Sequence, residues 1–272
     1  MTDSQSATGQ EPFKIDTSVA HPARVWDYWL GGKDNYPADR EVGDNIQSVM
    51  PDIAINARAD REFLGRVVRY LVGRVGIRQF LDIGTGIPSA NNTHEVAQAT
   101  APECRIVYVD NDPIVLAHAR ALLIGLPQGA TAYVDADLRE PDKILKAAAR
   151  TLDFRRPVAI MLLGILEFVT DNGEAQAILD RLLDAAPSGS YLAIAHPATE
   201  DPQDAMGRAL RAWNDSGAPP VAIRSRADLA RFFRRLELVD PGVVPLPRWR
   251  PDPGTRYADR EVLFFGAVGR KP

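Results

Sequence analysis

The chain has very little cysteine, no long apolar run and no excess of positive charge. Cys104 is its single cysteine, so no internal disulfide can form. No apolar stretch reaches the roughly 20 residues of a membrane-spanning helix, and the N-terminus lacks the charged-then-apolar pattern of a secretory signal. Acidic residues outnumber basic ones by 36 to 32, which argues against a phosphate backbone as the main partner. We therefore expect a cytoplasmic protein that binds neither nucleic acid nor a membrane.

The length and composition are those of one large folded domain with an appended segment. The chain has 272 residues, of which 45% are hydrophobic and 25% charged, as in ordinary globular proteins. Residues 1–12 are polar and small, which predicts a disordered tail. From residue 79 onward, strand-like and helix-like segments alternate, which predicts an α/β fold with a parallel sheet. The spacing of the four histidines predicts no metal site.

The stretch Gln79–Pro88 reads as a short buried strand that runs into a glycine turn. Its apolar residues suit a sheet that is covered on both faces. Asp82 stands at the carboxyl end of the strand, where open α/β sheets bind their ligands. Gly84 and Gly86 allow a tight turn and bring backbone N–H groups close to a ligand.

Two classes of nucleotide cofactor use such a turn, and the surrounding residues distinguish them. A dinucleotide fingerprint requires a third glycine three residues after Gly86, where this chain has Ser89. Short-chain reductases also require a tyrosine followed by a lysine four residues later, and none of the seven tyrosines has one. The carboxylate of Asp82 would repel a pyrophosphate, whereas S-adenosylmethionine carries an ammonium and a sulfonium group. The turn therefore favours S-adenosylmethionine over a nicotinamide cofactor.

Two further acids follow at the ends of the next two predicted strands. Asp110 ends the second strand, 24 residues after Gly86, and an acid at this place accepts hydrogen bonds from both ribose hydroxyls. Asp137 follows the third strand and is placed to accept from the adenine amino group, while the Leu138 N–H donates to a ring nitrogen. Three acids at successive strand ends are a more specific signal than the glycines alone.

The rest of the predicted cofactor-binding set lies beside these acids and before the sheet. Asn111 follows Asp110 directly, and Leu163 ends the fourth strand. On the helix before the sheet, Arg58 or Arg61 can reach the carboxylate of the cofactor's amino-acid tail with its forked guanidinium. We take Arg58 as the candidate.

The segments at both ends of the chain predict further helices and strands. Before the sheet, the pattern predicts helices that begin at Pro22, Ala38 and Ile53. The turn of residues 33–37 is either a simple connection or a lid over the ligand. The C-terminal part predicts a helix with a capping box over Ser225–Leu236 and two last strands over residues 236–244 and 261–268.

Several stretches resemble class I S-adenosylmethionine-dependent methyltransferases, and more narrowly an actinobacterial family long catalogued as a domain of unknown function. These stretches are His21–Tyr36, Phe80–Gly86, Val107–Pro113, Phe232–Phe233 and Trp249–Pro251. The resemblance covers nearly the whole chain after residue 12. It implies a Rossmann-like, mostly parallel sheet of seven strands with helices on both faces. It also implies an N-terminal helical cap over residues 13–75 and a class I methyltransferase domain over residues 76–272.

In this fold the loop after the fourth strand faces the transferred methyl group. Glu167 in that loop is a candidate general base or substrate anchor, and it reads equally well as a surface acid that opens the next helix. Tyr36 and Trp29 of the cap are candidates to face the cation or to clamp the acceptor. We take Glu167 and Tyr36 as the candidate catalytic residues. His196 after the fifth strand is more typical of a structural histidine near the rim than of a proton acceptor.

The expected reaction is in-line attack by an oxygen, nitrogen or carbon nucleophile on the sulfonium methyl group. The acceptor is expected to be a small molecule whose identity the sequence does not give. Alignment of the reactants and exclusion of water contribute roughly 7–11 kcal/mol in such reactions. A second class of function stays open, a regulator that binds S-adenosylmethionine without catalysis, because fold alone does not fix function.

Overall fold

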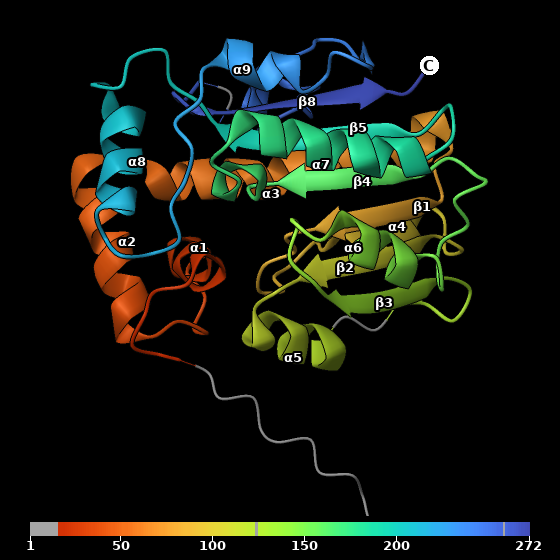
Figure 1. The fold of residues 1–272 in the computed structure, drawn as a ribbon, viewed down its shortest axis with the longest axis horizontal. Coiled ribbons are helices and arrows are strands. Elements are labelled where there is room, and N and C mark those ends of the chain that lie inside the picture. Colours follow the sequence, from red (N-terminus) through yellow and green to blue (C-terminus); the bar gives the residue numbers. More distant parts are fainter. Residues whose placement is uncertain (1–15, 123–124, 258) are drawn as a thin grey trace, which may run out of the picture.

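The computed structural model describes residues 16–122, 125–257 and 259–272, so the tail predicted over residues 1–12 lies outside the described residues. Its centre is one sheet in the strand order β3-β2-β1-β4-β5-β8-β6, with β7 also paired to β8 (Figure 1). The strands are β1 (Gln79–Ile83), β2 (Arg105–Asp110), β3 (Ala130–Asp135), β4 (Ala159–Leu163), β5 (Tyr191–Pro197), β6 (Glu237–Leu238), β7 (Val244–Pro245) and β8 (Phe264–Arg270). The first five strands pair in parallel, and the chain order reverses between β1 and β4.

The other edge of the sheet is antiparallel. β8 runs antiparallel to β5, and both β6 and β7 pair with β8. The single strand predicted over residues 236–244 is wrong, because a turn at Pro241 and Gly242 divides it. The Gly242 N–H donates to the Val239 carbonyl, and the glycine has a φ of 82°. Within the described residues the sheet therefore has eight strands instead of seven, and the predicted class of a mostly parallel α/β sheet is confirmed.

The helices begin largely where local sequence signals place them. They are α1 (Pro22–Leu30), α2 (Pro37–Val49), α3 (Ile53–Tyr70), α4 (Thr93–Thr100), α5 (Pro113–Leu122), α6 (Pro141–Ala148), α7 (Asn172–Ala185), α8 (Ala205–Asn214) and α9 (Arg226–Arg231), with a π-helical turn η1 (Leu71–Val75) and 3₁₀ turns η2 (Leu166–Phe168) and η3 (Leu246–Arg248). Ser225 and Asp228 form the predicted capping box of α9. That helix ends earlier than predicted, because the Phe233 N–H donates to the Ala230 carbonyl in a tighter turn. None of the described helices is long and apolar enough to cross a membrane.

Helices cover both faces of the sheet because successive strand residues point to opposite sides. In β1, Phe80 packs into a core shared with α3 and α4, whereas Leu81 packs into a core shared with α6 and α7. Ile106 and Val107 of β2 divide between the same two cores. Figure 1 views the sheet with α6 and α7 in front and α3 behind. The parallel strands are thus the middle of three layers, and ligands can reach them at their ends.

The helices that precede β1 are packed in two ways. α1 and α2 gather with α8 beyond the carboxyl ends of the parallel strands (Figure 1). α3 instead enters the core of the sheet with Phe63 and Val67. The buried Arg66 of α3 also donates to the carbonyls of Leu246 at 2.7 Å and Trp249 at 3.0 Å, near the C-terminus. The last helix of the predicted cap therefore shares the packing of the sheet, and the division of the chain at residue 75 stays a prediction.

Candidate active site

A cavity of about 300 Å³ lies at the carboxyl ends of β1 to β4, within the size range of small-molecule sites. The turns after these strands form one side of it, and α1 and α3 form the other. The predicted cofactor-binding residues that line it are Asp82, Gly84, Gly86, Asp110, Asn111, Asp137, Leu138 and Leu163. The remaining elements add, among others, His21, Trp26, Asp27, Asp60, Arg61, Leu64, Pro219 and Pro220.

The glycine turn after β1 takes a shape that only glycine adopts without strain. Gly84 and Gly86 have φ values of 77° and 65°, and the Gly84 N–H donates to the Val109 carbonyl at 2.8 Å. A Cβ on Gly84 would lie 2.6 Å from the Cβ of Ile165, whereas no described atom lies within 4 Å of a Cβ on Gly86. The first glycine therefore permits close packing, and the second presents its backbone to open space at the cavity.

We expect Gly84→Ala to destabilise the fold more than Gly86→Ala does. The left-handed backbone costs an alanine about 1–2 kcal/mol at either position, but at Gly84 the new methyl group must also displace Ile165. Urea unfolding of the ligand-free variants measures the difference. Equal free energies of unfolding for the two variants would contradict this account of the turn.

Asp110 is buried, and backbone N–H groups hold both of its carboxylate oxygens. The Gly86 N–H donates to Oδ2 and the Asp112 N–H donates to Oδ1, each at 2.9 Å. Burial raises the pKa of Asp110, and these two donors oppose the rise. Because a carboxylate offers about four acceptor positions, each oxygen can still accept from a ligand hydroxyl. The acid at the tip of β2 and the glycine turn after β1 thus form one unit.

Asp137 and Asn111 meet where the loops after β2 and β3 come together. The Asn111 Nδ2 donates to Asp137 Oδ2 at 3.0 Å, and the Arg139 N–H donates to Oδ1 at 2.8 Å. Asp135, the other acid at this strand end, is exposed and lies outside the cavity lining. Asp137 is therefore the acid of this pair that lines the cavity.

Of the two arginines considered on α3, Arg61 lines the cavity and Arg58 does not. Successive residues of an α-helix are rotated by roughly 100°, so the side chain of Arg58 points about 200° away from that of Asp60. Asp60 lines the cavity, and the side chain of Arg58 is exposed. The Nε of Arg61 is buried and has no hydrogen-bond partner among the described residues. Its Nη2 makes a long contact of 3.3 Å with the Ala90 carbonyl. The choice of Arg58 from the sequence is therefore corrected to Arg61 as the arginine at the cavity.

The cavity carries more negative than positive groups. Burial raises the pKa of Asp60 to about 7 and that of Asp82 to about 6, and the nearby Arg61 lowers both. Thr93 Oγ1 donates to Asp82 at 2.6 Å, but Asp60 Oδ1 is buried without a hydrogen-bond partner in the described part of the chain. Among the described residues, five aspartates line the cavity, against two arginines and one histidine. A ligand with positive charge fits this balance.

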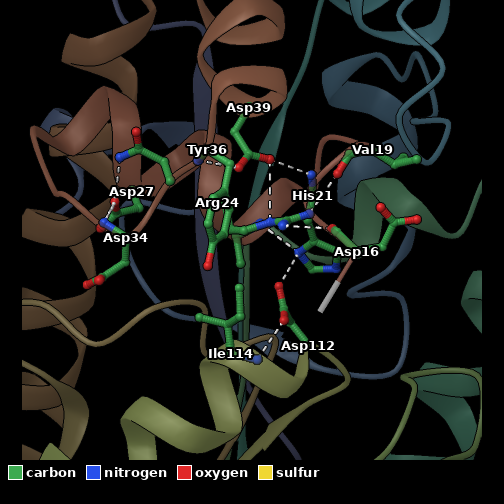
Figure 2. A network of polar contacts seen from close by, with 12 residues as sticks. Asp16, Val19, His21, Arg24, Asp27, Asp34, Tyr36, Asp39, Asp112 and Ile114 are labelled. Carbon is green, nitrogen blue, oxygen red and sulfur yellow. Dashed lines mark hydrogen bonds and ion pairs between the residues drawn. The ribbon is translucent and has the colours of Figure 1, made fainter. Parts of the chain in front are cut away.

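Figure 2 shows the network that holds the start of α1 against the loop after β2. The Nδ1 of His21 lies 2.8 Å from Asp112 Oδ2. The buried Asp39 of α2 accepts from the backbone N–H groups of His21 at 2.9 Å and Tyr36 at 2.8 Å. The guanidinium of Arg24 lies 3.4 Å from the same carboxylate. These contacts fix α1 over the cavity and join the cap to the loop that follows Asp110.

Tyr36, one of the two predicted catalytic residues, lies outside the cavity lining. It caps α2, and its half-buried ring packs against Arg24, whose guanidinium lies 5.5 Å from the ring centre. The turn of residues 33–37 reaches the cavity through Asp27, which accepts from the Asn35 side chain at 2.8 Å. Trp26 is the aromatic residue of the cap that lines the cavity. The position of Tyr36 thus gives no support to a catalytic role.

Glu167, the other predicted catalytic residue, is buried in η2 and lines a second cavity of about 40 Å³. The two cavities share Trp26 and Phe168. Burial raises the pKa of Glu167 to about 8, the charge of Asp60 raises it further, and Arg224 lowers it. The alternative of a surface acid is therefore wrong, because only 3% of the residue is exposed.

His196 is fully buried, so the expected place near the rim is wrong. Its Nε2 lies 2.9 Å from Nη1 of Arg224. Burial, assisted by that guanidinium, lowers the pKa of His196 to about 3. The interpretation as a structural histidine fits this place.

Sequence reasoning missed Asp60, His21 and Trp26 as site residues. For Asp60 a signal was present, because it lies on one helical stripe with the buried Ala57 and Leu64, and a carboxyl group on an apolar stripe is unusual. His21 and Trp26 gave no such signal, because their role depends on how α1 lies over the sheet.

The fold and the site together define a class of protein. A sheet with β8 antiparallel between β5 and β6, and a cavity at the carboxyl ends of β1 and β2, is the class I methyltransferase fold. The chain belongs to the S-adenosyl methyltransferase family, whose model matches residues 8–272. It is an S-adenosylmethionine-dependent methyltransferase, and the family resemblance seen in the sequence is confirmed.

Solved structures support the same family. A protein of the DUF574 family from Streptomyces avermitilis is 47% identical, with 95% of this chain and 100% of that chain covered and a TM-score of 0.91. A putative methyltransferase from Thermobifida fusca is 38% identical over 94% of this chain and 96% of that chain, with a TM-score of 0.84. The methyltransferase SibL is 20% identical over 80% of this chain and 57% of its own, with a TM-score of 0.50, which shows the fold alone. No curated protein matches the chain significantly.

The cavity fits S-adenosylmethionine, which supplies a methyl group bound to a positively charged sulfur. Two residues of its lining carry a buried atom without a hydrogen-bond partner among the described residues: the Nε of Arg61, which can donate to a carboxylate, and the Oδ1 of Asp60, which can accept from an ammonium. The Gly86 backbone also faces open space. These groups of the protein complement the parts of S-adenosylmethionine, which is an α-amino acid joined to a nucleoside through a sulfonium.

Proposed function

We propose that the enzyme transfers the methyl group of S-adenosylmethionine to a small-molecule acceptor. The observation that carries this proposal is the cavity at the strand ends, which α1 covers and which shares the lining residues Trp26 and Phe168 with the smaller cavity. The larger space suits the cofactor, and the smaller one suits a compact acceptor. The two cavities can be explained by a cofactor and a small acceptor, without a macromolecular substrate.

We further propose a role for each residue that would hold the cofactor. Asp110 accepts from the two ribose hydroxyls, and Asp137 accepts from the adenine amino group while the Leu138 N–H donates to the ring. Asn111 holds Asp137 in place through its hydrogen bond. The remaining contacts to the amino-acid part and the sulfonium come from Asp82, Gly84, Gly86, Leu163 and Arg61.

In this proposal Arg61 takes the role first given to Arg58, and a matched pair of variants tests the assignment. We expect Arg61→Met to weaken S-adenosylmethionine binding by about tenfold or more, because it removes a charge-assisted contact with the carboxylate. Binding of 5′-methylthioadenosine, which lacks the amino-acid part, should stay unchanged. Arg58→Met on the same helix is the control and should bind both ligands like the wild type. Calorimetry measures all affinities, and equal losses for both ligands would contradict the assignment.

Turnover tests the function itself. The purified chain is incubated with S-adenosylmethionine and fractions of small metabolites, and formation of S-adenosylhomocysteine is followed. Formation that depends on one small-molecule fraction supports the proposal. Tight binding without turnover in any fraction would favour the regulator that the sequence left open. Turnover that depends on protein or nucleic acid alone would contradict a small-molecule acceptor.

A further inference from the structure

The ring of His21 ties the start of α1 to the loop after β2 (Figure 2). Its Nδ1 lies 2.8 Å from Oδ2 of Asp112, and the two side chains are 28% and 5% exposed. That carboxylate oxygen is buried and accepts no hydrogen bond from any other described residue. Two atoms with free electron pairs would repel each other at this distance, so Nδ1 carries a hydrogen and donates it to Asp112. The Ala23 N–H lies farther from Nδ1, at 3.3 Å.

Asp112 connects this contact to the acid at the tip of β2. Its backbone N–H donates to Asp110 Oδ1 at 2.9 Å, and its own Oδ1 accepts from the Ile114 N–H at 2.8 Å, at the start of α5. Burial acts to raise the pKa of Asp112, but the contact with His21 brings this pKa below its ordinary value. Asp112 is therefore a carboxylate that α5 holds on one side and His21 on the other, while its N–H supports Asp110.

The backbone of His21 is held independently of its ring. The buried Asp39 of α2 accepts from the His21 N–H at 2.9 Å, and the guanidinium of Arg24 lies 3.4 Å from the same carboxylate. Among the described residues, the charged side chains near His21 are Asp16, Arg24, Asp39, Asp110 and Asp112. Negative charge prevails in this set, so a positively charged ring is attracted to this place more strongly than a neutral one.

The position of α1 matters for a ligand because α1 forms one side of the larger cavity. His21 and Trp26 line the cavity from that side, and Asp110 and Asn111 line it from the loop after β2. The contact between His21 and Asp112 joins these two sides. A ligand placed against Asp110 is therefore covered by α1 while this contact is made.

We infer that His21 is a positioning residue for the ribose: through Asp112 it holds both Asp110 and α1 against the adenosine half of the ligand, and it does so best when its ring is protonated. This inference rests on the proposed role of Asp110. Imidazole is the side chain whose charge changes between about pH 5 and pH 8. A hydrogen bond to a carboxylate is stronger from a charged donor than from a neutral one. The hold on the adenosine half thus loosens as the pH rises through this range.

Binding of 5′-methylthioadenosine to the full chain tests the inference, because this probe contains the ribose but no ammonium, carboxylate or sulfonium. We expect His21→Ala to weaken its binding about tenfold or more at about pH 6, because Asp112 loses its partner and Asp110 loses support. His118→Gln is the matched control and should bind the probe like the wild type. The Nε2 of His118 lies 3.6 Å from Asp34 of the cap, in a pair that is 31% and 47% exposed, and such pairs contribute little.

The pH profile separates this role from a merely structural one. In His21→Asn an amide nitrogen, as many bonds from the backbone as Nδ1, can donate to Asp112 but cannot become charged. The aspartates are the same in both proteins, so their titration contributes to both profiles. We expect the affinity of the wild type relative to His21→Asn to fall about threefold to tenfold between about pH 5.5 and pH 8.5. Calorimetry at each pH measures this ratio.

The possible results separate the two levels of the proposal. A wild type that binds neither S-adenosylmethionine nor 5′-methylthioadenosine would refute the proposed function. A wild type that binds both, with a profile parallel to that of His21→Asn, would overturn the role of the protonated ring and leave the proposed function standing. If His21→Ala does not fold, the comparison with His21→Asn still decides. An equal loss of affinity in His118→Gln would also overturn the inference, because any contact between the cap and α5 would then serve.

Discussion

Replacing Asp110 with alanine is expected to weaken S-adenosylmethionine binding by at least about 100-fold. In the proposed complex the carboxylate accepts from two ribose hydroxyls, and two hydrogen bonds to a charged group contribute about 3–6 kcal/mol together. The variant also leaves the N–H groups of Gly86 and Asp112 without their acceptor, which loosens the turn. Calorimetric titration of wild type and variant measures the loss.

Asp135→Ala is the matched control for this experiment. Asp135 is paired with Asp110 in the register of β2 and β3, and it is also a strand-end acid, but it is exposed outside the cavity. The control should bind S-adenosylmethionine like the wild type. Asparagine is not a neutral replacement at Asp110, because its amide nitrogen would face one of two N–H groups. An Asp110→Ala variant that remains folded and binds with unchanged affinity would refute the role of this carboxylate.

Replacing Glu167 with glutamine is expected to make the ligand-free protein more stable at alkaline pH. The folded-state pKa of about 8 lies above the ordinary glutamate value of 4.5, so between these values the folded state holds a proton that the unfolded state has released. The stability of the wild type therefore falls as pH rises through this window. Glutamine stays neutral and avoids that loss, so the advantage of the variant should grow by a few kcal/mol between about pH 5 and pH 9.

Urea unfolding across this pH range measures the difference between the two proteins. Glu41→Gln, which alters an exposed acid on α2, is the control, and its stability should run parallel to that of the wild type. A difference between Glu167→Gln and the wild type that does not change over this pH range would show that the pKa of Glu167 is ordinary or lowered, as it would be if Arg224 held the carboxylate in its charged form.

The part of the site that the sequence predicts well is the part built from strands. Buried parallel strands end at the same edge of a sheet, so the places of Asp82, Asp110 and Asp137 follow from the strand pattern alone. The glycines that follow Asp82 indicate a turn with a left-handed backbone, which few other residues adopt. Nothing further about the packing of the chain is needed to bring these groups into one cavity.

Residues on helices and in loops were harder to place, because their side chains depend on packing that the pattern does not contain. Arg58 and Arg61 are three residues apart, and only the rotation of α3 against the sheet decides which one reaches the cavity. Tyr36 lies in a turn whose direction is fixed by Asp39 and by Arg24. Helix α6 was not predicted at all, although Pro141 marks its start.

The ring of Trp26 belongs to the walls of both cavities, and this has a consequence for the order and strength of ligand binding. In the proposed complex, with the cofactor in the larger cavity and the acceptor in the smaller one, a ligand that moves this ring would change the shape of the space on the other side. By linkage the effect is reciprocal: any factor by which the cofactor changes the affinity for the acceptor is the factor by which the acceptor changes the affinity for the cofactor. The same reciprocity applies to the two products: the departure of one product from its cavity would change the affinity of the protein for the other product.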